Sequence, residues 1–235
     1  MHLSRTSTIL AITLIVLVFS NCISDQSESQ DRRASTTEKS ETEVSKGFDE
    51  MSSAYYESGA RVIWQKPELV INILGDLGSK TIADIGAGTG YFAFRLAAAG
   101  GTVIGIDIDP RAISFMNTEK ERYPPDVQQR FSTRLAATGS ANLNKEEVDV
   151  VLMVNTYIYL ADRVTYLTDL KKGMKENGQL IIIDFKKKET TIGPAIEDRL
   201  SILQVQQELS QAGYNILSVD ENTFEYQYLV RAIRP

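Results

Sequence analysis

From about Phe48 onward, short apolar segments alternate with segments of helical pattern, and this alternation limits the possible folds more than any other feature. Two of the apolar segments, "VDVVLMV" (residues 148–154) and "LIIID" (residues 180–184), are apolar along nearly their whole length. A strand of this kind has to be covered on both faces, which is typical of parallel sheets flanked by helices. The sequence therefore predicts an α/β protein.

The order of the expected elements predicts the sheet in more detail. The last two strands follow each other without an intervening helix, so one of them is expected to run antiparallel at the edge. We predict a single Rossmann-like, doubly wound, mostly parallel seven-stranded sheet with an antiparallel edge strand. The predicted strands are 81–85, 102–108, 127–133, 148–154, 180–185, 216–220 and 226–233, and the predicted helices are 67–77, 91–99, 110–122, 162–176 and 201–212.

Residues 1–22 resemble the leader of an exported bacterial lipoprotein. Arg5 is followed by an apolar run over residues 9–19, which is too short to span a membrane but fits a secretory signal. Cys22 stands where such a leader is cut and the new terminus acylated, so we predict an exported lipoprotein that a lipid anchor holds on the membrane. Export without lipidation, an uncleaved interfacial anchor and a cytoplasmic-face location stay open as alternatives.

Residues 23–47 are expected to form a disordered polar tether. From Ser24 to Gly47 there is no aromatic residue, and Ala34 and Val44 are the only aliphatic ones. Such a segment buries too little apolar surface to offset the entropy of ordering the chain. The folded domain is therefore predicted to span residues 48–235.

Composition excludes several kinds of chemistry. The formal net charge of −6 offers no basic surface for a nucleic acid, so no nucleic-acid partner is expected. The one cysteine, Cys22, and the one histidine, His2, both lie in the predicted leader. We therefore predict no metal site, and the domain lacks the residue that most often serves as a general base.

The segment "ADIGAGTGYFAFRLA" (residues 83–97) joins a predicted strand to a predicted helix through three alternating glycines. A dinucleotide fingerprint would need a glycine at position 91, which is Tyr91, and no lysine of a phosphate-binding loop follows. At the end of the next strand, Asp107 could accept both hydroxyls of a ribose. Alternatively, the glycines serve only tight packing and Asp107 only caps a helix.

The turn Gly86-x-Gly88-x-Gly90, with Asp107 behind it, resembles the class I S-adenosylmethionine-dependent methyltransferases. The segment "RVIWQKPELVI" (residues 61–71) further resembles a bacterial subgroup in which the upstream segment closes over the cofactor pocket. Trp64 is expected either to line the cofactor pocket or to pack in the core. Asp84 is expected either to help hold the amino-acid end of the cofactor or to bond only to loop amides. The resemblance implies S-adenosylmethionine as cofactor, with binding residues Asp84, Gly86, Ala87, Gly88, Gly90, Asp107, Ile108, Ser140, Asn155 and Gln65.

The residues expected to face the methyl acceptor differ from those of that subgroup, because no histidine follows Asn155 and Thr156. The remaining candidates for a catalytic base are Asp184 and Tyr157, with Tyr159 beside them. Ion pairing with nearby lysines and core packing are the competing interpretations for Asp184 and Tyr159.

The predicted function is methyl transfer from S-adenosylmethionine to an unidentified small-molecule or protein acceptor. One alternative is a non-catalytic cofactor-binding module displayed on an exported lipoprotein. A nucleotide-dependent oxidoreductase is disfavoured by Tyr91. The oligomeric state is left open.

Overall fold

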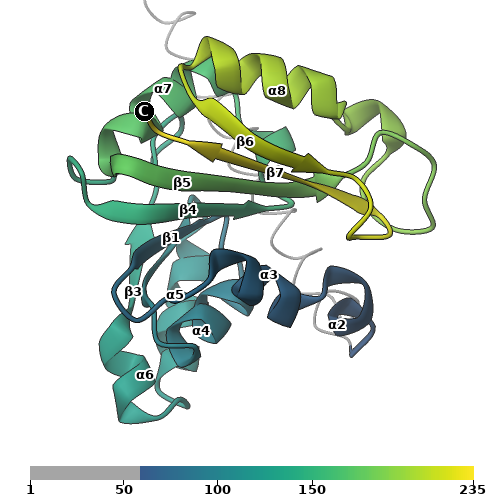
Figure 1. Ribbon diagram of the computed structural model, residues 1–235. Helices are drawn as coiled ribbons and strands as arrows, with labels where there is room; N and C mark the ends of the chain where they lie inside the picture. The colour runs from purple at the N-terminus through teal and green to yellow at the C-terminus, as the bar shows by residue number, and fades with distance from the viewer. Residues whose placement is uncertain (1–58) are drawn as a thin grey trace, which may run out of the picture. The chain divides into compact units, whose positions relative to one another are not determined.

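A seven-stranded sheet lies at the centre of the computed structural model, which describes residues 59–235 (Figure 1). These residues all belong to a unit that spans Phe48–Pro235. The predicted leader, the predicted tether and Cys22 lie outside the described residues. The strands are β1 (Thr81–Ile85), β2 (Thr102–Asp107), β3 (Phe131–Leu135), β4 (Val148–Val154), β5 (Met174–Phe185), β6 (Asn215–Asp220) and β7 (Gln227–Ile233).

The strand order is β3-β2-β1-β4-β5-β7-β6. Strands β1 to β5 pair in parallel, whereas β7 pairs antiparallel with both β5 and β6. The predicted doubly wound sheet with an antiparallel edge region is therefore confirmed. The order reverses between β1 and β4, and a sheet of this type binds its ligands at the carboxyl ends of the strands at such a point.

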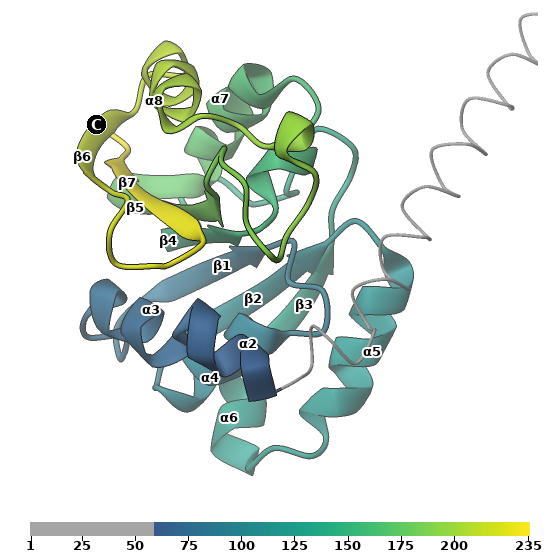
Figure 2. The same ribbon diagram turned by 90° about the vertical axis from the view of Figure 1, so that its right-hand side faces the viewer.

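Helices cover both faces of the sheet (Figure 2). Along β5 the side chains alternate between the two cores: Ile181 and Ile183 pack on one face, Leu180 and Ile182 on the other. All four are fully buried, which is why the strand is apolar throughout. The first face packs against α3 (Pro67–Leu74), α4 (Tyr91–Ala98), α5 (Pro110–Lys120) and α6 (Pro125–Arg130), the second against α7 (Arg163–Gly173) and α8 (Ile202–Gln211).

Several predicted boundaries are wrong, most clearly those of β3, α3, α7 and β5. The predicted strand 127–133 begins as helix α6, because Pro125 stands at its first turn, where proline fits, and the strand begins only at Phe131. Helix α7 ends at Gly173, three residues before the predicted end, and β5 already begins at Met174. The position of Gly173 has a packing reason, since a Cβ there would lie 2.5 Å from the side chain of Leu143.

Asp109 rather than Asp107 caps helix α5. The Asp109 carboxylate accepts the amide of Arg111 at 2.8 Å and pairs with its guanidinium at 2.7 Å. The Asp109 amide in turn donates to the Asp107 carboxylate at 3.0 Å. Asp107 is thereby available at the end of β2 for a role other than capping.

A short helix that the sequence pattern did not predict, α2 (Gly59–Gln65), precedes α3. Lys66 separates the two helices with a left-handed backbone conformation (φ 47°), and Pro67 begins α3. The buried indole of Trp64 packs against Phe185 and Tyr226, with ring centroids 5.8 and 6.4 Å away. This contact agrees with the core-packing interpretation of Trp64.

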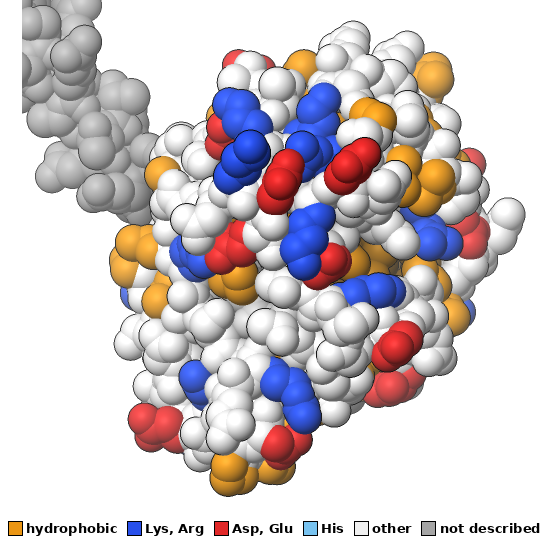
Figure 3. All heavy atoms as spheres, turned by 60° about the vertical axis from the view of Figure 1, so that its left-hand side comes forward, with side chains coloured by type: hydrophobic (Ala, Val, Ile, Leu, Met, Phe, Trp, Pro, Cys, Tyr) orange, Lys and Arg blue, Asp and Glu red, His pale blue; other side chains and the backbone are white. Residues whose placement is uncertain are grey.

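The described surface is mixed in charge. On the face that Figure 3 shows, basic and acidic side chains lie interspersed. Among the described residues, Arg134 pairs with Glu147 at 2.6 Å and Lys175 pairs with Asp149 at 2.8 Å. Within residues 59–235, no helix combines the length and apolar character that a membrane crossing would demand.

Candidate functional site

The glycine turn joins β1 to α4 at the carboxyl end of the sheet. Gly86, Gly88 and Gly90 all have positive φ angles, of 74°, 56° and 82°, which side chains rarely tolerate. The amides of Gly86 and Ala87 both donate to the carbonyl of Ile106, at 2.8 and 3.0 Å. The turn is thereby held against β2.

Two of these glycines also serve packing within the chain. A Cβ on Gly86 would lie 2.2 Å from Thr156, and a Cβ on Gly90 would lie 2.6 Å from the ring of Phe94. The packing interpretation of the turn therefore holds at these two positions, alongside any contact with a ligand.

The carboxylate of Asp107 joins the end of β2 to the same turn. One of its oxygens accepts the amide of Gly88 at 2.8 Å, and the other accepts the amide of Asp109 at 3.0 Å. Burial raises the pKa of Asp107, and the two amides oppose that shift. A carboxylate has about four acceptor positions, so two are left for the hydroxyls of a ribose.

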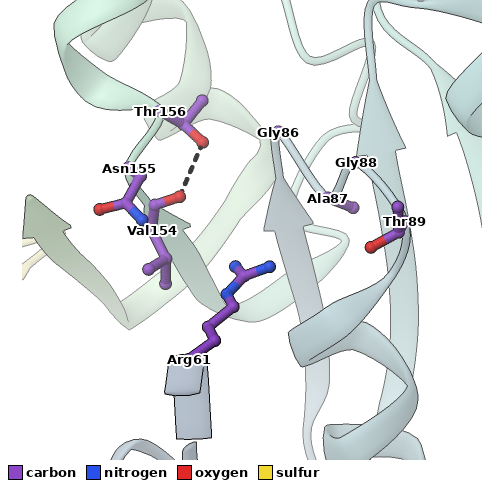
Figure 4. Close-up of a pocket in the computed structure, with 8 residues that line it drawn as sticks. All are labelled: Arg61, Gly86, Ala87, Gly88, Thr89, Val154, Asn155 and Thr156. Atoms are coloured by element: carbon purple, nitrogen blue, oxygen red, sulfur yellow. Dashed lines mark hydrogen bonds between the residues drawn. The ribbon is translucent and has the colours of Figure 1, made fainter. Parts of the chain in front are cut away.

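A cavity opens between the carboxyl ends of β1 and β4 (Figure 4). Its enclosed volume is about 50 Å³, smaller than the roughly 300–1,000 Å³ of small-molecule sites. The side chain of Arg61 reaches into it from α2. The cavity is lined by Arg61, Gly86, Ala87, Gly88, Thr89, Val154, Asn155 and Thr156.

Asp84 lies beneath the turn, almost fully buried. Burial raises its pKa to about 7, against the stabilising effects of the Ala93 amide and the charge of Arg61. Ala93 belongs to the first turn of α4 and not to the loop, so bonding to loop amides and a role toward the cofactor both stay predictions for Asp84.

Of the other predicted cofactor residues, Asn155 lines the cavity, whereas Ile108 and Ser140 are not among the described residues around it. Asn155 adopts a left-handed conformation (φ 57°) and accepts a hydrogen bond from Gln227 at 2.5 Å. Ile108 is 41% exposed just beyond β2, so its apolar surface is accessible to a ligand. Ser140 instead donates to Asp169 at 3.0 Å.

Gln65 was predicted to line the pocket, but it is not among the described residues around the cavity. It is fully buried, and its side-chain oxygen accepts a hydrogen bond from Nε of Arg61 at 2.7 Å. Its contact with the cavity is therefore indirect, through Arg61.

Both predicted catalytic residues are fully buried and lie outside the cavity lining. The Asp184 carboxylate accepts the amides of Phe185 at 2.8 Å and Ile158 at 3.4 Å, and it pairs with no lysine among the described residues. The Tyr157 hydroxyl donates to Glu208 at 2.7 Å, and burial raises its pKa. These contacts indicate that Asp184 and Tyr157 position the short helix η1 (Tyr157–Tyr159). Tyr159, in contrast, is 70% exposed, so its side chain does not pack in the core.

Four cavity residues were missed as candidates: Arg61, Thr89, Val154 and Thr156. Arg61 begins the segment "RVIWQKPELVI", on which the resemblance to the bacterial subgroup rested. That segment was therefore the sequence signal for Arg61, but Trp64 and Gln65 were selected from it instead.

The buried aspartates give the free energy of unfolding a pH dependence. Burial raises the pKa of Asp184, like that of Asp84, from an ordinary 3.8 to about 7. Between these values the folded chain keeps protons that the unfolded chain has lost, so the free energy of unfolding falls as the pH rises and levels off above about 7. The thermal midpoint of Asp184→Asn is expected to decline less between pH 5 and pH 8 than that of the wild type.

Asp220→Asn is the control for this measurement. Hydrogen bonds from Thr223 and Asn222 lower the pKa of Asp220, so its titration falls below pH 4. The control should therefore shift the wild-type curve without changing its slope. A slope of Asp184→Asn equal to that of the wild type would contradict the prediction.

The fold and the site together define a class of protein. A glycine turn at the reversal point of the strand order, with an acid at the end of the next strand, is the arrangement of an S-adenosylmethionine-dependent methyltransferase. Residues 78–230 match the family described as Methyltransferase domain, and the chain belongs to that family. S-adenosylmethionine is its methyl donor.

Individual relatives agree with this assignment. The chain is 25% identical to a demethylmenaquinone methyltransferase of Tropheryma whipplei over 194 residues, which cover 80% of this chain and 75% of the relative. A crystal structure of an S-adenosylmethionine-dependent methyltransferase from Aquifex aeolicus superposes with a TM-score of 0.71 at 23% identity, covering 83% of this chain and 98% of that one. A glycopeptide N-methyltransferase in complex with S-adenosylhomocysteine shares the fold at a TM-score of 0.61 and 14% identity, covering 73% and 90%.

Proposed function

We propose that Asp107 and the glycine turn hold S-adenosylmethionine for transfer of its methyl group to an acceptor that enters beside η1. The observation that carries the proposal is the hydrogen bond between the Asp107 carboxylate and the Gly88 amide, which joins a ribose acceptor to the turn. These residues fit the cofactor, because the Asp107 carboxylate keeps free acceptor positions for the ribose and the apolar side chain of Ile108 lies exposed next to it.

When bound, S-adenosylmethionine supplies an electrophilic methyl group on a sulfonium. The chain would contribute orientation and exclusion of water, and proximity alone can lower the barrier by ~7–11 kcal/mol. Of the described residues around the cavity, none is an acid or a histidine. We infer that the nucleophile of the acceptor does not need a residue of the cavity to remove a proton from it. Asp184 and Tyr157 serve to position η1.

The acceptor is unidentified, but the surface on the side of β4 and β5 favours one with an apolar portion. Tyr159 of η1 is 70% exposed, and Ile196, in the segment that follows β5, is 39% exposed. Both belong to segments that follow the carboxyl ends of strands neighbouring the cavity.

Transfer of a radiolabelled methyl group tests the function. The purified full-length protein is incubated with labelled S-adenosylmethionine and extract from its own cells, and labelled products are separated by size and polarity. Label in a discrete product supports the proposal and reveals the class of acceptor. Micromolar binding of the cofactor without label transfer to any extract fraction would instead favour a non-catalytic binding module.

We also propose that Cys22 carries a lipid anchor and that the protein is exported, on the strength of the leader alone. Cys22→Ala is expected to move from the membrane fraction to the soluble fraction and to lose incorporation of a labelled fatty acid. Thr6→Ala, in the same leader, leaves the cysteine intact and serves as control. If the Cys22→Ala protein stayed as firmly membrane-bound as wild type, lipid anchoring would be refuted.

A further inference from the structure

Arg199 is a buried arginine whose guanidinium binds the backbone of one loop. This loop, residues 186–201, leaves the end of β5 and returns at the start of α8 (Figure 1, Figure 2). Arg199 is 3% exposed, and each of its five N–H groups donates to a carbonyl oxygen of the loop, at distances of 2.6 to 3.2 Å. The carbonyls are those of Lys186, Lys188, Ile192 and Pro194. Because a buried charge is costly unless it is hydrogen-bonded, the side chain and the shape of the loop depend on each other.

The last two residues of β5 join this loop to η1. Gly193 has a φ of 95°, and a Cβ there would lie 2.6 Å from the ring of Phe185, so the loop packs closely on that ring. The Arg199 guanidinium lies 5.3 Å from the centroid of the same ring. The neighbouring Asp184 accepts the amide of Ile158 in η1. The loop and η1 are therefore held against the same end of β5.

A hollow of about 360 Å³ lies in the loop, lined by residues 189–196 and Arg199. This volume falls within the roughly 300–1,000 Å³ of small-molecule sites. Glu189 is the acid among its described lining residues, and the donors of Arg199 are occupied by the backbone. Its apolar lining comes from Ile192, Pro194, Ala195 and Ile196. The hollow therefore suits an uncharged, largely apolar part of a ligand.

We propose that Arg199 is a positioning residue for the methyl acceptor, because it holds the loop of residues 186–201 as a preformed wall for the apolar portion of that acceptor. Its guanidinium does not bind the acceptor itself, since the loop carbonyls take all of its donors. A loop that is already ordered does not have to be ordered on binding, which strengthens the binding of its ligand. This inference rests on the proposed function.

Two measurements on the full-length protein separate the acceptor side from the donor side. The rate of label transfer is followed against the amount of cell extract at saturating labelled S-adenosylmethionine, and calorimetry gives the dissociation constant of S-adenosylhomocysteine. Arg199→Ala is expected to need at least tenfold more extract for a half-maximal rate, while the dissociation constant changes less than threefold. Arg199→Lys keeps the charge but has fewer donors, so it should recover part of the loss.

A second variant disturbs the loop without removing Arg199. Gly193→Ala places a Cβ against the Phe185 ring at a positive φ, so it should change the extract dependence in the same direction and leave the dissociation constant within threefold. Arg234→Ala is the matched control. Arg234 is mostly buried and donates to the carbonyl of Met174 at the opposite end of β5. Its loss should leave both quantities within threefold of wild type.

Cleavage after Glu189 by a glutamate-specific protease reports the order of the loop itself. Arg199→Ala should be cut there at least tenfold faster than wild type. Unchanged cleavage or an unchanged extract dependence would overturn the inference. An equal loss of S-adenosylhomocysteine affinity would also overturn it, because Arg199 would then support the whole domain.

In each of these cases, label transfer by the wild type still supports the proposed function. A wild-type protein that binds S-adenosylhomocysteine but transfers no label would contradict the proposed function and, with it, the acceptor role of Arg199.

Discussion

Replacing Asp107 with alanine is expected to weaken S-adenosylhomocysteine and 5′-methylthioadenosine by the same factor, of at least ten. Both ligands carry the ribose, and a hydrogen bond to a charged group contributes about 1.5–3 kcal/mol, where 1.4 kcal/mol corresponds to a factor of ten. The variant also releases the amides of Gly88 and Asp109, which loosens the glycine turn. Titration calorimetry with each ligand measures the effect.

Two further variants bracket this prediction. Asp107→Asn keeps one acceptor oxygen and the side-chain shape, so an intermediate loss is expected. Asp126→Ala removes an exposed carboxylate that pairs with Arg130 at 2.9 Å on α6, and it should leave binding unchanged. Wild-type affinity in Asp107→Ala, or a loss confined to S-adenosylhomocysteine, would contradict the ribose assignment.

Gly90→Ala is expected to lower the free energy of unfolding by about 3 kcal/mol, since a left-handed conformation costs a side chain roughly 1–2 kcal/mol and overpacking of a core roughly 1–3 kcal/mol more. The added Cβ would lie 2.6 Å from the Phe94 ring and 3.3 Å from Met116. Phe94 cannot swing aside, because its ring stacks on Tyr123 and packs on Phe131, each at a centroid distance of 4.5 Å. Denaturation in urea measures the change.

Gly139→Ala isolates the conformational part of this cost. Gly139 has a similar φ of 87°, but a Cβ there would meet no atom within 4 Å. Its loss should be about 1–2 kcal/mol, the cost of the left-handed conformation alone. Equal losses in the two variants would show that packing around Gly90 relaxes without cost.

The sequence was most informative where one physical requirement dominates. Strands β1 and β4 were predicted to the residue, because their side chains are buried on both faces and turn signals bound them. The glycine turn and Asp107 were selected by their spacing, and the structure joins them through the hydrogen bond from the Gly88 amide to the Asp107 carboxylate.

Prediction failed where tertiary contacts decide. Helix α2 has no periodic apolar face of its own, and Trp64 is held by Phe185 and Tyr226, more than 100 residues away in the chain. Nothing local indicates that the Tyr157 hydroxyl faces Glu208 on α8 instead of the cavity. Arg61 looked like an ordinary charged helix residue until the structure placed it against the turn.

The place of β7 has a consequence for how the molecule is made on the ribosome. Of the seven strands, β7 emerges last, yet it lies between β5 and β6. Until residues 227–233 are synthesised, β6 has no strand to pair with and β5 presents an open apolar edge, a state prone to aggregation. A nonsense codon near residue 226 would remove an interior strand rather than a dispensable tail.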